Sequence, residues 1–240
     1  MRVSTYQEKG ILPGKTEMED RIVAGHNILS DGYHCLENTG NGIYAVCDGV
    51  GGQAGSSFAS FTVSCSLAGL SVPIPQKELM NSLRAVHQRL IESGTTATTL
   101  TAININDCSM YMVHIGNCRL YRLTDGYLCQ ISTDQTRVED LRRLGVAEEE
   151  IPKAERTIIN ACLGVRSELI EKMVSADITK EIRHSTRMLL TSDGIHDHVT
   201  IDELELFMKK EITKDSLKNL ADLSRAKGSA DDISIMVIER

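Results

Sequence analysis

Hydrophobic residues along the chain form short runs that predict β-strands. Each run has four to eight residues, is rich in Val, Ile, Thr or Tyr, and is bounded by Gly, Asn, Asp or Ser. We expect tight hairpin turns at Asn106-Asp107 and Asp125-Gly126, which lie between or directly after such runs. The predicted strands are residues 21–28, 42–47, 98–105, 109–115, 119–123, 169–176, 188–191 and 233–238.

Four other segments predict helices. Three of them place apolar residues at helical spacing, and residues 53–70 follow glycines and are rich in Ala, Ser and Phe. These segments are residues 53–70, 76–92, 201–209 and 216–227. Strands and helices are therefore clustered along the chain and do not alternate, a pattern typical of an α+β fold with antiparallel sheets. The sequence contains no internal repeat and no stretch resembling a flexible linker, so we expect residues 1–240 to form a single domain.

One interval, residues 134–164, differs from the rest of the chain. It is strongly charged, and only a short piece over residues 138–144 is amphipathic. Such a segment is typical of an excursion from a sheet framework, and excursions of this kind often border a binding site.

The composition is that of an ordinary globular protein, with 41% hydrophobic and 25% charged residues. A net charge of −7 argues against nucleic acid or a membrane surface as the main partner, because both attract a surplus of Lys and Arg. A bound metal ion suits this balance better. No apolar run is long enough for a signal peptide or a membrane span, so we expect a cytoplasmic protein. The seven cysteines are irregularly spaced and contain no Cys-x-x-Cys pair, which favours small buried side chains over disulfides or a zinc site.

Acidic residues stand at the ends of several hydrophobic runs. Each would place a carboxylate at a rigid sheet edge, where a following glycine lets the backbone approach a ligand closely. Converging carboxylates repel one another unless a cation lies between them, and hard divalent ions such as Mg²⁺ and Mn²⁺ prefer oxygen ligands. For the isolated pairs Asp31-Gly32 and Asp125-Gly126, an ordinary β-turn is the simpler interpretation. The sites that favour a metal are Asp48-Gly49, Asp193-Gly194 and Asp231-Asp232.

These carboxylates belong to a set of six short motifs. In chain order the motifs are Lys15-Thr16-Glu17-Met18-Glu19-Asp20, Ala45-Val46-Cys47-Asp48-Gly49-Val50-Gly51-Gly52, Gly94-Thr95-Thr96-Ala97-Thr98-Thr99, His114-Ile115-Gly116-Asn117-Cys118-Arg119, Thr191-Ser192-Asp193-Gly194-Ile195 and Ser229-Ala230-Asp231-Asp232-Ile233-Ser234. Together they resemble the metal-dependent Ser/Thr protein phosphatases of type 2C, and most of all the compact bacterial members. The resemblance spans essentially the whole chain, and the shared order of six motifs makes it specific.

The resemblance implies a four-layer αββα sandwich, in which two antiparallel sheets face each other and a helix pair covers each of them. It also implies two Mn²⁺ or Mg²⁺ ions in a cleft at one end of the sheets. Asp48 would bridge the two ions, and the carbonyl group of Gly49 would bind one of them. Asp193 and Asp231 would complete the other ion's ligands and, with Asp48, form the catalytic set.

The implied reaction is the hydrolysis of phosphoserine or phosphothreonine on proteins. Glu19 and Asp20 correspond to the acidic pair that binds the metals or orients metal-bound water. A water held between two divalent ions supplies hydroxide near neutral pH and attacks phosphorus in line, so no phosphoenzyme is required. The implied partners are phosphorylated proteins that a Ser/Thr kinase modifies, and we expect a monomer. Residues 134–164 would occupy the position of the family's flap, which touches the substrate.

Three positions depart from the family pattern. Lys15 replaces an Arg that binds the substrate phosphate, so phosphate would meet a point charge instead of a bidentate fork. Val50 replaces a His that animal members carry as a proposed general acid. Asn117 replaces an Asp that helps to hold a third metal ion in bacterial members, which predicts a weakened or missing third site. The leaving group would then take its proton from metal-bound water or another residue, and the histidines available are His26, His34, His114, His196 and His198.

Two other functions compete with an active phosphatase. The departures at Lys15 and Asn117 leave open a binding or regulatory module that has the same fold and little activity. A two-metal nuclease is disfavoured, because the chain is acidic and has no basic stripe.

Overall fold

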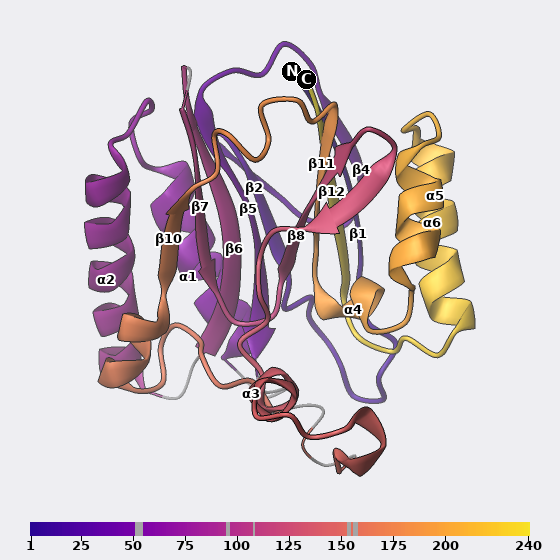
Figure 1. The fold of residues 1–240 in the computed structure, drawn as a ribbon. Helices are drawn as coiled ribbons and strands as arrows, with labels where there is room; N and C mark the ends of the chain where they lie inside the picture. The colour runs from indigo at the N-terminus through magenta and orange to yellow at the C-terminus, as the bar shows by residue number, and fades with distance from the viewer. Residues whose placement is uncertain (51–54, 95–96, 108, 153–154, 156–157) are drawn as a thin grey trace.

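The computed structural model describes residues 1–50, 55–94, 97–107, 109–152, 155 and 158–240. Within these residues two antiparallel six-stranded sheets lie face to face, and a pair of helices covers the outer face of each sheet (Figure 1). The predicted α+β sandwich with four layers is therefore confirmed. Both chain termini lie together at one end of the sheets.

The first sheet contains the N- and C-terminal strands as direct neighbours. Strand β1 lies between β4 and β12, and every pair in the sheet is antiparallel. In spatial order the strands are β4 (Gly32–Leu36), β1 (Arg2–Glu8), β12 (Ile233–Glu239), β11 (Arg187–Thr191), β8 (Arg119–Thr124) and β9 (Tyr127–Gln130).

The second sheet is built around the long hairpin of β6 and β7. The turn at Asn106-Asp107 joins these strands, and Asn106 lies opposite Ser109. In spatial order the strands are β10 (Val174–Asp177), β7 (Ser109–Ile115), β6 (Ala97–Asn106), β5 (Gly42–Val50), β2 (Arg21–Ala24) and β3 (Asn27–Leu29).

One pair of helices packs on the outer face of each sheet. Helices α1 (Ser56–Ala68) and α2 (Gln76–Ser93) cover the second sheet, and helices α5 (Ile201–Met208) and α6 (Lys214–Ala226) cover the first (Figure 1). None of the helices in the described part of the chain is long and apolar enough to cross a bilayer. Shorter elements are α3 (Arg137–Arg143), α4 (Asp193–His196) and the 3-10 turns η1 (Glu148–Glu150) and η3 (Ser167–Lys172).

Local sequence explains where the outer helices begin. Helix α5 starts at a capping box, in which the Thr200 side chain accepts from the backbone N–H of Glu203 and the Glu203 carboxylate accepts from that of Thr200. Thr213 and Ser216 form the same reciprocal cap at α6. Helix α2 follows Pro75, whose fixed φ suits a helix start.

Three hydrophobic layers hold the four structural layers together. One lies between the second sheet and α1 and α2, one between the two sheets, and one between the first sheet and α5 and α6. Because both faces of each sheet are covered, many strands are buried on both sides instead of alternating. Strand β6, for example, is buried at every residue except its last.

Most predicted elements are present, and two predicted strands are wrong in extent. Residues 21–28 form two strands, because Gly25 at φ 62° turns the chain and Ala24 pairs with Asn27. Of residues 169–176, the first four belong to η3. Strand β10 starts only at Val174, which pairs with His114 near the end of β7, so the residues before it have no strand to pair with.

The predicted turns and helices agree with the structure. Asp107, Asp125 and Asp31 all adopt positive φ, as residues in tight turns do. The predicted helices are present, and so is the short piece over 138–144 as α3. The first two residues of the predicted helix 53–70, with Gly51, Gly52, Thr95 and Thr96 of the motifs and Cys108, lie outside the described residues.

Strand β1 escapes detection from the sequence because its middle is polar. Ser4, Thr5 and Gln7 are at most 1% exposed, although the residue types suggest a surface. Inside the sheet the side-chain Nε2 of Gln7 donates to the Ser234 hydroxyl at 2.9 Å, a contact between the two chain ends. Among the cysteines, Cys47, Cys118 and Cys162 are buried as expected, whereas Cys65 and Cys129 are exposed and Cys35 is half-buried.

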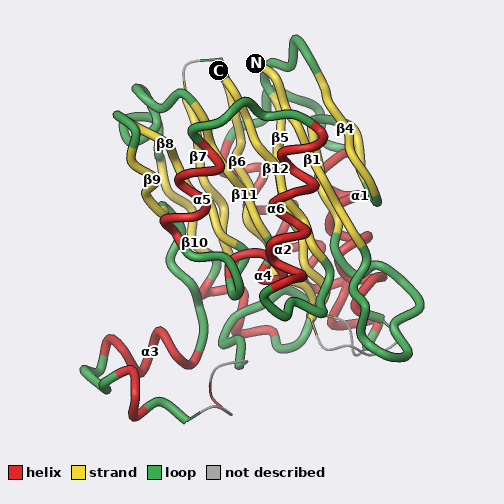
Figure 2. Tube along the Cα trace, turned by 90° about the vertical axis from the view of Figure 1, so that its right-hand side faces the viewer, coloured by secondary structure: helices red, strands yellow, loops and turns green. Residues whose placement is uncertain are grey.

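The charged segment 134–164 leaves the sheets at the end opposite the termini (Figures 1 and 2). Its two limbs meet where Thr136 pairs with Ile159, and its end is tied to β6 through the bridge between Leu163 and Thr98. Gln135 links the base of the excursion to the loop after β7, since its backbone N–H donates to the carbonyl of Gly116 at 2.8 Å. The excursion is thus anchored at both ends next to the strand ends.

The layer between the two sheets predicts a large cost for shortening Leu120, which is fully buried there. We expect Leu120→Ala to lower the free energy of unfolding by about 2–5 kcal/mol in a urea titration, because a cavity remains. The matched control is Leu206→Ala on α5, where the side chain is 59% exposed and the change should stay within about 0.5 kcal/mol. Equal effects in the two variants would contradict the placement of this core.

Candidate metal centre

Antiparallel pairing brings the predicted acidic residues to one end of each sheet, where strands begin and end. Strand β2 pairs antiparallel with β5, and Arg21 lies opposite Cys47. Asp20 before β2 and Asp48 near the end of β5 therefore lie at the same end of the sheet. In the first sheet β11 runs against β12. Asp193 after β11 and Asp231 before β12 therefore also lie at one end of their sheet. The two sheet ends face each other across the sandwich.

A cleft of about 380 Å³ lies between these two sheet ends. It is bordered on one side by the 134–164 excursion, through Thr136 and Ile159. Asp20 does not line the cleft directly and is only 1% exposed behind it. Six of the seven site residues predicted from the sequence line the cleft, namely Lys15, Glu19, Asp48, Gly49, Asp193 and Asp231.

Carboxylates this close together resist ionisation. Burial, followed by the charges of Asp193 and Asp20, raises the pKa of Asp48 well above its usual range. Burial, followed by the charges of Asp197 and Asp231, raises the pKa of Asp193 to about 7. Without a cation, the cleft therefore holds carboxyl groups whose charges are mutually unfavourable.

Asp20 is the most deeply buried of these carboxylates, and its charge is also unfavourable. Burial and the charge of Asp232 raise its pKa to about 8, although hydrogen bonds from the hydroxyls of Ser192 and Ser234 favour the charged form. Its Oδ2 atom is buried and has no hydrogen-bond partner among the described residues. A buried carboxylate oxygen without a donor fits a cation, so the residues present suit hard divalent ions.

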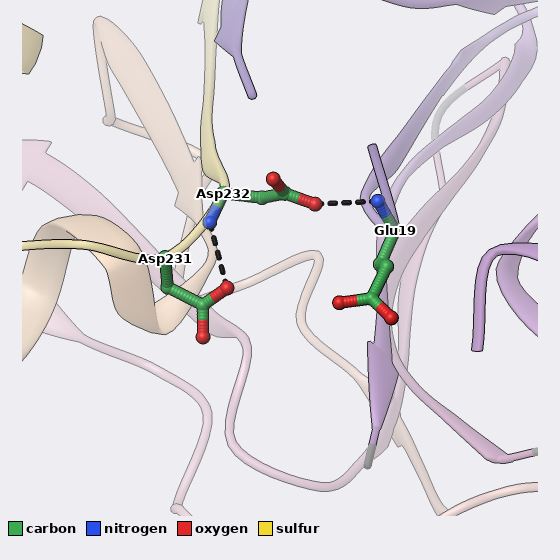
Figure 3. A group of neighbouring side chains, drawn as sticks. All are labelled: Glu19, Asp231 and Asp232. Atoms are coloured by element: carbon green, nitrogen blue, oxygen red, sulfur yellow. Dashed lines mark hydrogen bonds between the residues drawn. The ribbon is translucent and has the colours of Figure 1, made fainter. Parts of the chain in front are cut away.

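Asp232 is a member of this cluster that the sequence analysis did not assign. Its carboxylate accepts from the backbone N–H groups of Gly10 at 2.6 Å, Glu19 at 2.5 Å and Asp20 at 3.2 Å, so it fixes the acidic loop before β2. Figure 3 shows Asp231 and Asp232 facing Glu19 across a small gap. Carboxylate oxygens of these three residues lie within 4.8 Å of one another. The tandem Asp231-Asp232 was the available signal, but only the fold shows which of the two is buried.

Lys15 places its ammonium group in this gap. Its Nζ lies 2.8 Å from Glu19 Oε2, 2.9 Å from Asp231 Oδ1 and 3.2 Å from Asp232 Oδ2. Burial acts to lower the pKa of the ammonium, but hydrogen bonds to Asp231 and Glu19 outweigh it, and the pKa is raised. The residue predicted to bind phosphate is therefore paired with carboxylates in this structure.

Asn117 contacts the cleft from the loop after β7. Its Nδ2 donates to Asp193 Oδ2 at 3.0 Å and so orients that carboxylate. Its Oδ1 is buried without a hydrogen-bond partner in the described part of the chain. Of the five histidines considered as proton donors, His198 is the one that lines this cleft among the residues that the structure describes.

The glycines next to the aspartates are required by close packing of the backbone, not by turns. Gly49 continues strand β5, and a Cβ there would lie 2.5 Å from the carbonyl oxygen of Ser56. Gly194 lies within α4, and a Cβ there would lie 1.9 Å from the carbonyl oxygen of Asp232. The two glycines therefore bring the segments that carry the carboxylates into contact.

No family model matches the sequence. The chain is 27% identical over 256 residues to the Ser/Thr protein phosphatase PstP of Mycobacterium tuberculosis, a match that covers 100% of this chain and 45% of PstP. It is 26% identical over 220 residues to the Ser/Thr phosphatase Stp of Listeria monocytogenes, covering 82% of this chain and 84% of Stp. The chain thus spans about half the length of the mycobacterial relative and most of the listerial one.

Solved structures agree with the fold. A crystal structure of M. tuberculosis PstP superposes with a TM-score of 0.77 at 25% identity, covering 100% of this chain and 99% of that one. The PstP catalytic domain in complex with two manganese ions superposes with a TM-score of 0.73 at 24% identity, with the same coverage. The two-sheet sandwich of this chain is therefore the fold of those catalytic domains.

The conflict at Asp20 predicts that the metal-free protein gains stability when this charge is removed. At pH 9, above the raised pKa of Asp20, we expect Asp20→Asn to increase the free energy of unfolding by about 0.5–2 kcal/mol, measured with urea in the presence of a chelator. The amide keeps the shape of the side chain but no longer repels Asp232.

The matched control is Asp222→Asn, which removes the same charge from the exposed face of α6 and breaks only a surface pair with Lys218. Its effect should stay within about 0.5 kcal/mol. A loss of stability in Asp20→Asn beyond that of the control would contradict the electrostatic argument.

Proposed function

The chain belongs to the type 2C family of bacterial Ser/Thr protein phosphatases, and we propose that it hydrolyses phosphoserine and phosphothreonine on proteins with the help of divalent cations. The observation that carries the proposal is the convergence of Asp48, Asp193 and Asp231 from both sheets on one cleft. The two manganese ions in the PstP catalytic domain support the same chemistry. We propose that residues 1–240 act as one catalytic domain.

We propose that this cleft binds two Mn²⁺ or Mg²⁺ ions. Asp48 would bridge them, the carbonyl oxygen of Gly49 would bind one ion, and Asp193 and Asp231 would bind the other. Glu19 and Asp20 would hold or orient the water ligands. Bound divalent cations lower the pKa of a water molecule and offset charge on the phosphoryl oxygens, so they supply both nucleophile and electrostatic stabilisation.

The chain's own residues prepare this arrangement. The Thr98 hydroxyl donates to the carbonyl oxygen of Asp48 at 2.8 Å and fixes the strand end from which the carboxylate projects. Asn117 orients Asp193. His198 lines the cleft and is the histidine best placed to give a proton to the leaving oxygen of the substrate. The 134–164 excursion would border the phosphoprotein, because Thr136 and Ile159 line the same cleft.

Some details rest on the sequence alone. The opposing Ser/Thr kinase, the monomeric state and the cytoplasmic location stay predictions. The alternative of a phosphatase-fold module with little activity receives no support from the relatives, which are named as phosphatases. Lys15, predicted to bind the phosphate, would have to leave its carboxylate partners to do so.

The proposed bridging role predicts the effect of Asp48→Asn. We expect turnover of a phosphothreonine peptide with Mn²⁺ to fall by about 10³-fold or more, because one bridging charge is lost, while circular dichroism shows a retained fold. Wild-type activity should disappear with excess chelator and return with Mn²⁺. The control is Asp222→Asn, which should retain activity. Near-normal turnover in Asp48→Asn would refute the assigned site, and a folded wild-type protein that binds Mn²⁺ but releases no phosphate would refute the enzyme.

The neutral side chain at position 117 predicts a weak or missing third metal site. Asn117→Asp adds a hard oxygen ligand beside Asp193, so we expect calorimetry to detect one additional Mn²⁺ per chain and the Mn²⁺ dependence of turnover to change. Asn219→Asp on the exposed face of α6 adds the same charge away from the cleft and serves as the control. An unchanged Mn²⁺ stoichiometry and dependence in Asn117→Asp would argue against this explanation.

A further inference from the structure

Lys15 occupies a position that a cation would favour. Its side chain is only 9% exposed, and its ammonium lies 2.8–3.2 Å from three carboxylates, those of Glu19, Asp231 and Asp232. Those carboxylates come from two segments far apart in the sequence, one before β2 and one before β12. Their oxygens are also mutually close enough to be ligands of a single ion.

The ammonium and a divalent ion cannot share these oxygens. Mn²⁺ and Mg²⁺ bind carboxylate oxygens at about 2.0–2.3 Å, closer than an ammonium does, and two positive charges in one gap repel each other. An ion that binds Glu19 Oε2 or Asp231 Oδ1 therefore has to displace Lys15 Nζ from that oxygen. Asp232 is the exception that can keep its place, because three backbone N–H groups hold it.

A second hollow next to the cleft could accommodate the displaced Lys15 side chain. This hollow has a volume of about 540 Å³, and Lys15 and Glu19 line both it and the cleft. The exposed Glu17 lines this hollow, so a displaced ammonium would meet solvent and a carboxylate there. The four-carbon stem of lysine is flexible, which allows the ammonium to change position while the backbone stays in place.

We propose that Lys15 is an internal competitor of the divalent cation. In the metal-free protein it neutralises the Glu19, Asp231 and Asp232 side of the cleft, and it leaves this position when a cation binds. The apparent affinity for the cation is reduced accordingly, because part of the binding energy goes into displacing the lysine. Displacement also frees the ammonium for a phosphate, so metal loading precedes phosphate binding by Lys15. This inference rests on the proposed metal-dependent function.

The first test compares Mn²⁺ binding to chelator-treated proteins by calorimetry. Lys15→Met keeps the stem and removes the charge, and we expect it to bind Mn²⁺ at least about tenfold more tightly than wild type. Lys15→Arg keeps the charge and should resemble wild type. Lys218→Met is the matched control, because it removes one positive charge from an exposed pair on α6 and should leave the affinity unchanged.

Thermal unfolding gives a readout that does not depend on activity. We expect metal-free Lys15→Met to melt below wild type, because three carboxylates lose their counter-charge. Saturating Mn²⁺ should then raise its melting temperature by more than it raises that of wild type. An affinity of Lys15→Met equal to or weaker than that of wild type would overturn the proposal.

A second test uses the unmodified protein and so does not depend on the folding of a variant. An amine-reactive reagent followed by mass spectrometry reports how accessible each lysine is, with Lys218 as the internal reference. We expect labelling of Lys15 to be slow without metal and to increase when Mn²⁺ is added. Labelling of Lys15 that is unchanged or decreased by Mn²⁺ would overturn the proposal.

These outcomes separate the inference from the function on which it rests. If wild type binds Mn²⁺ and hydrolyses the phosphothreonine peptide while Lys15→Met gains no affinity, only the role of Lys15 is refuted. If neither wild type nor Lys15→Met binds Mn²⁺, both the metal-dependent function and the competition are refuted.

Discussion

The desolvation and mutual repulsion of neighbouring carboxylates are the constraint on which the rest of the site depends. Asp20, Asp48 and Asp193 all have raised pKa values, and in each case burial is the first cause and neighbouring acids add to it. A fold that only needed stability would not collect such groups at one place. The arrangement is therefore best understood as a binding site whose favourable partner is a cation, with the lysine ammonium as its nearest substitute within the chain.

The sandwich is well suited to hold such a site. In an antiparallel sheet the start of one strand lies beside the end of its neighbour, so each sheet brings two acidic segments to the same end. The layer of apolar side chains between the sheets then fixes the two sheet ends against each other. Glycines at 49 and 194 permit backbone contacts that any side chain would prevent, and the buried Asp232 ties the segment before β12 to the segment before β2. Stability and chemistry are thus divided between the middle and one end of the sheets.

Much of this could be predicted from the sequence, because hydrophobic runs, turn residues and the order of acidic motifs are local signals. Strand β7 and the turn at Asn106-Asp107 are examples, as is the position of Asp48 near a strand end. Strand β1 could not be found, because its Ser, Thr and Gln residues look like surface residues although they are buried, and the Ser234 partner of Gln7 lies more than 200 residues away. For the same reason the anchoring role of Asp232 and the carboxylate partners of Lys15 are visible only in the folded chain.

The most direct test of the central claim is the position of metal ions in crystals of the protein grown with Mn²⁺, located by anomalous diffraction at the manganese absorption edge. We predict two strong peaks in the cleft, both within ligand distance of Asp48, with Asp193 and Asp231 beside one of them and Lys15 turned away from its carboxylates. A well-ordered cleft without manganese, or manganese bound only elsewhere on the surface, would contradict the claim that these carboxylates converge in order to hold cations.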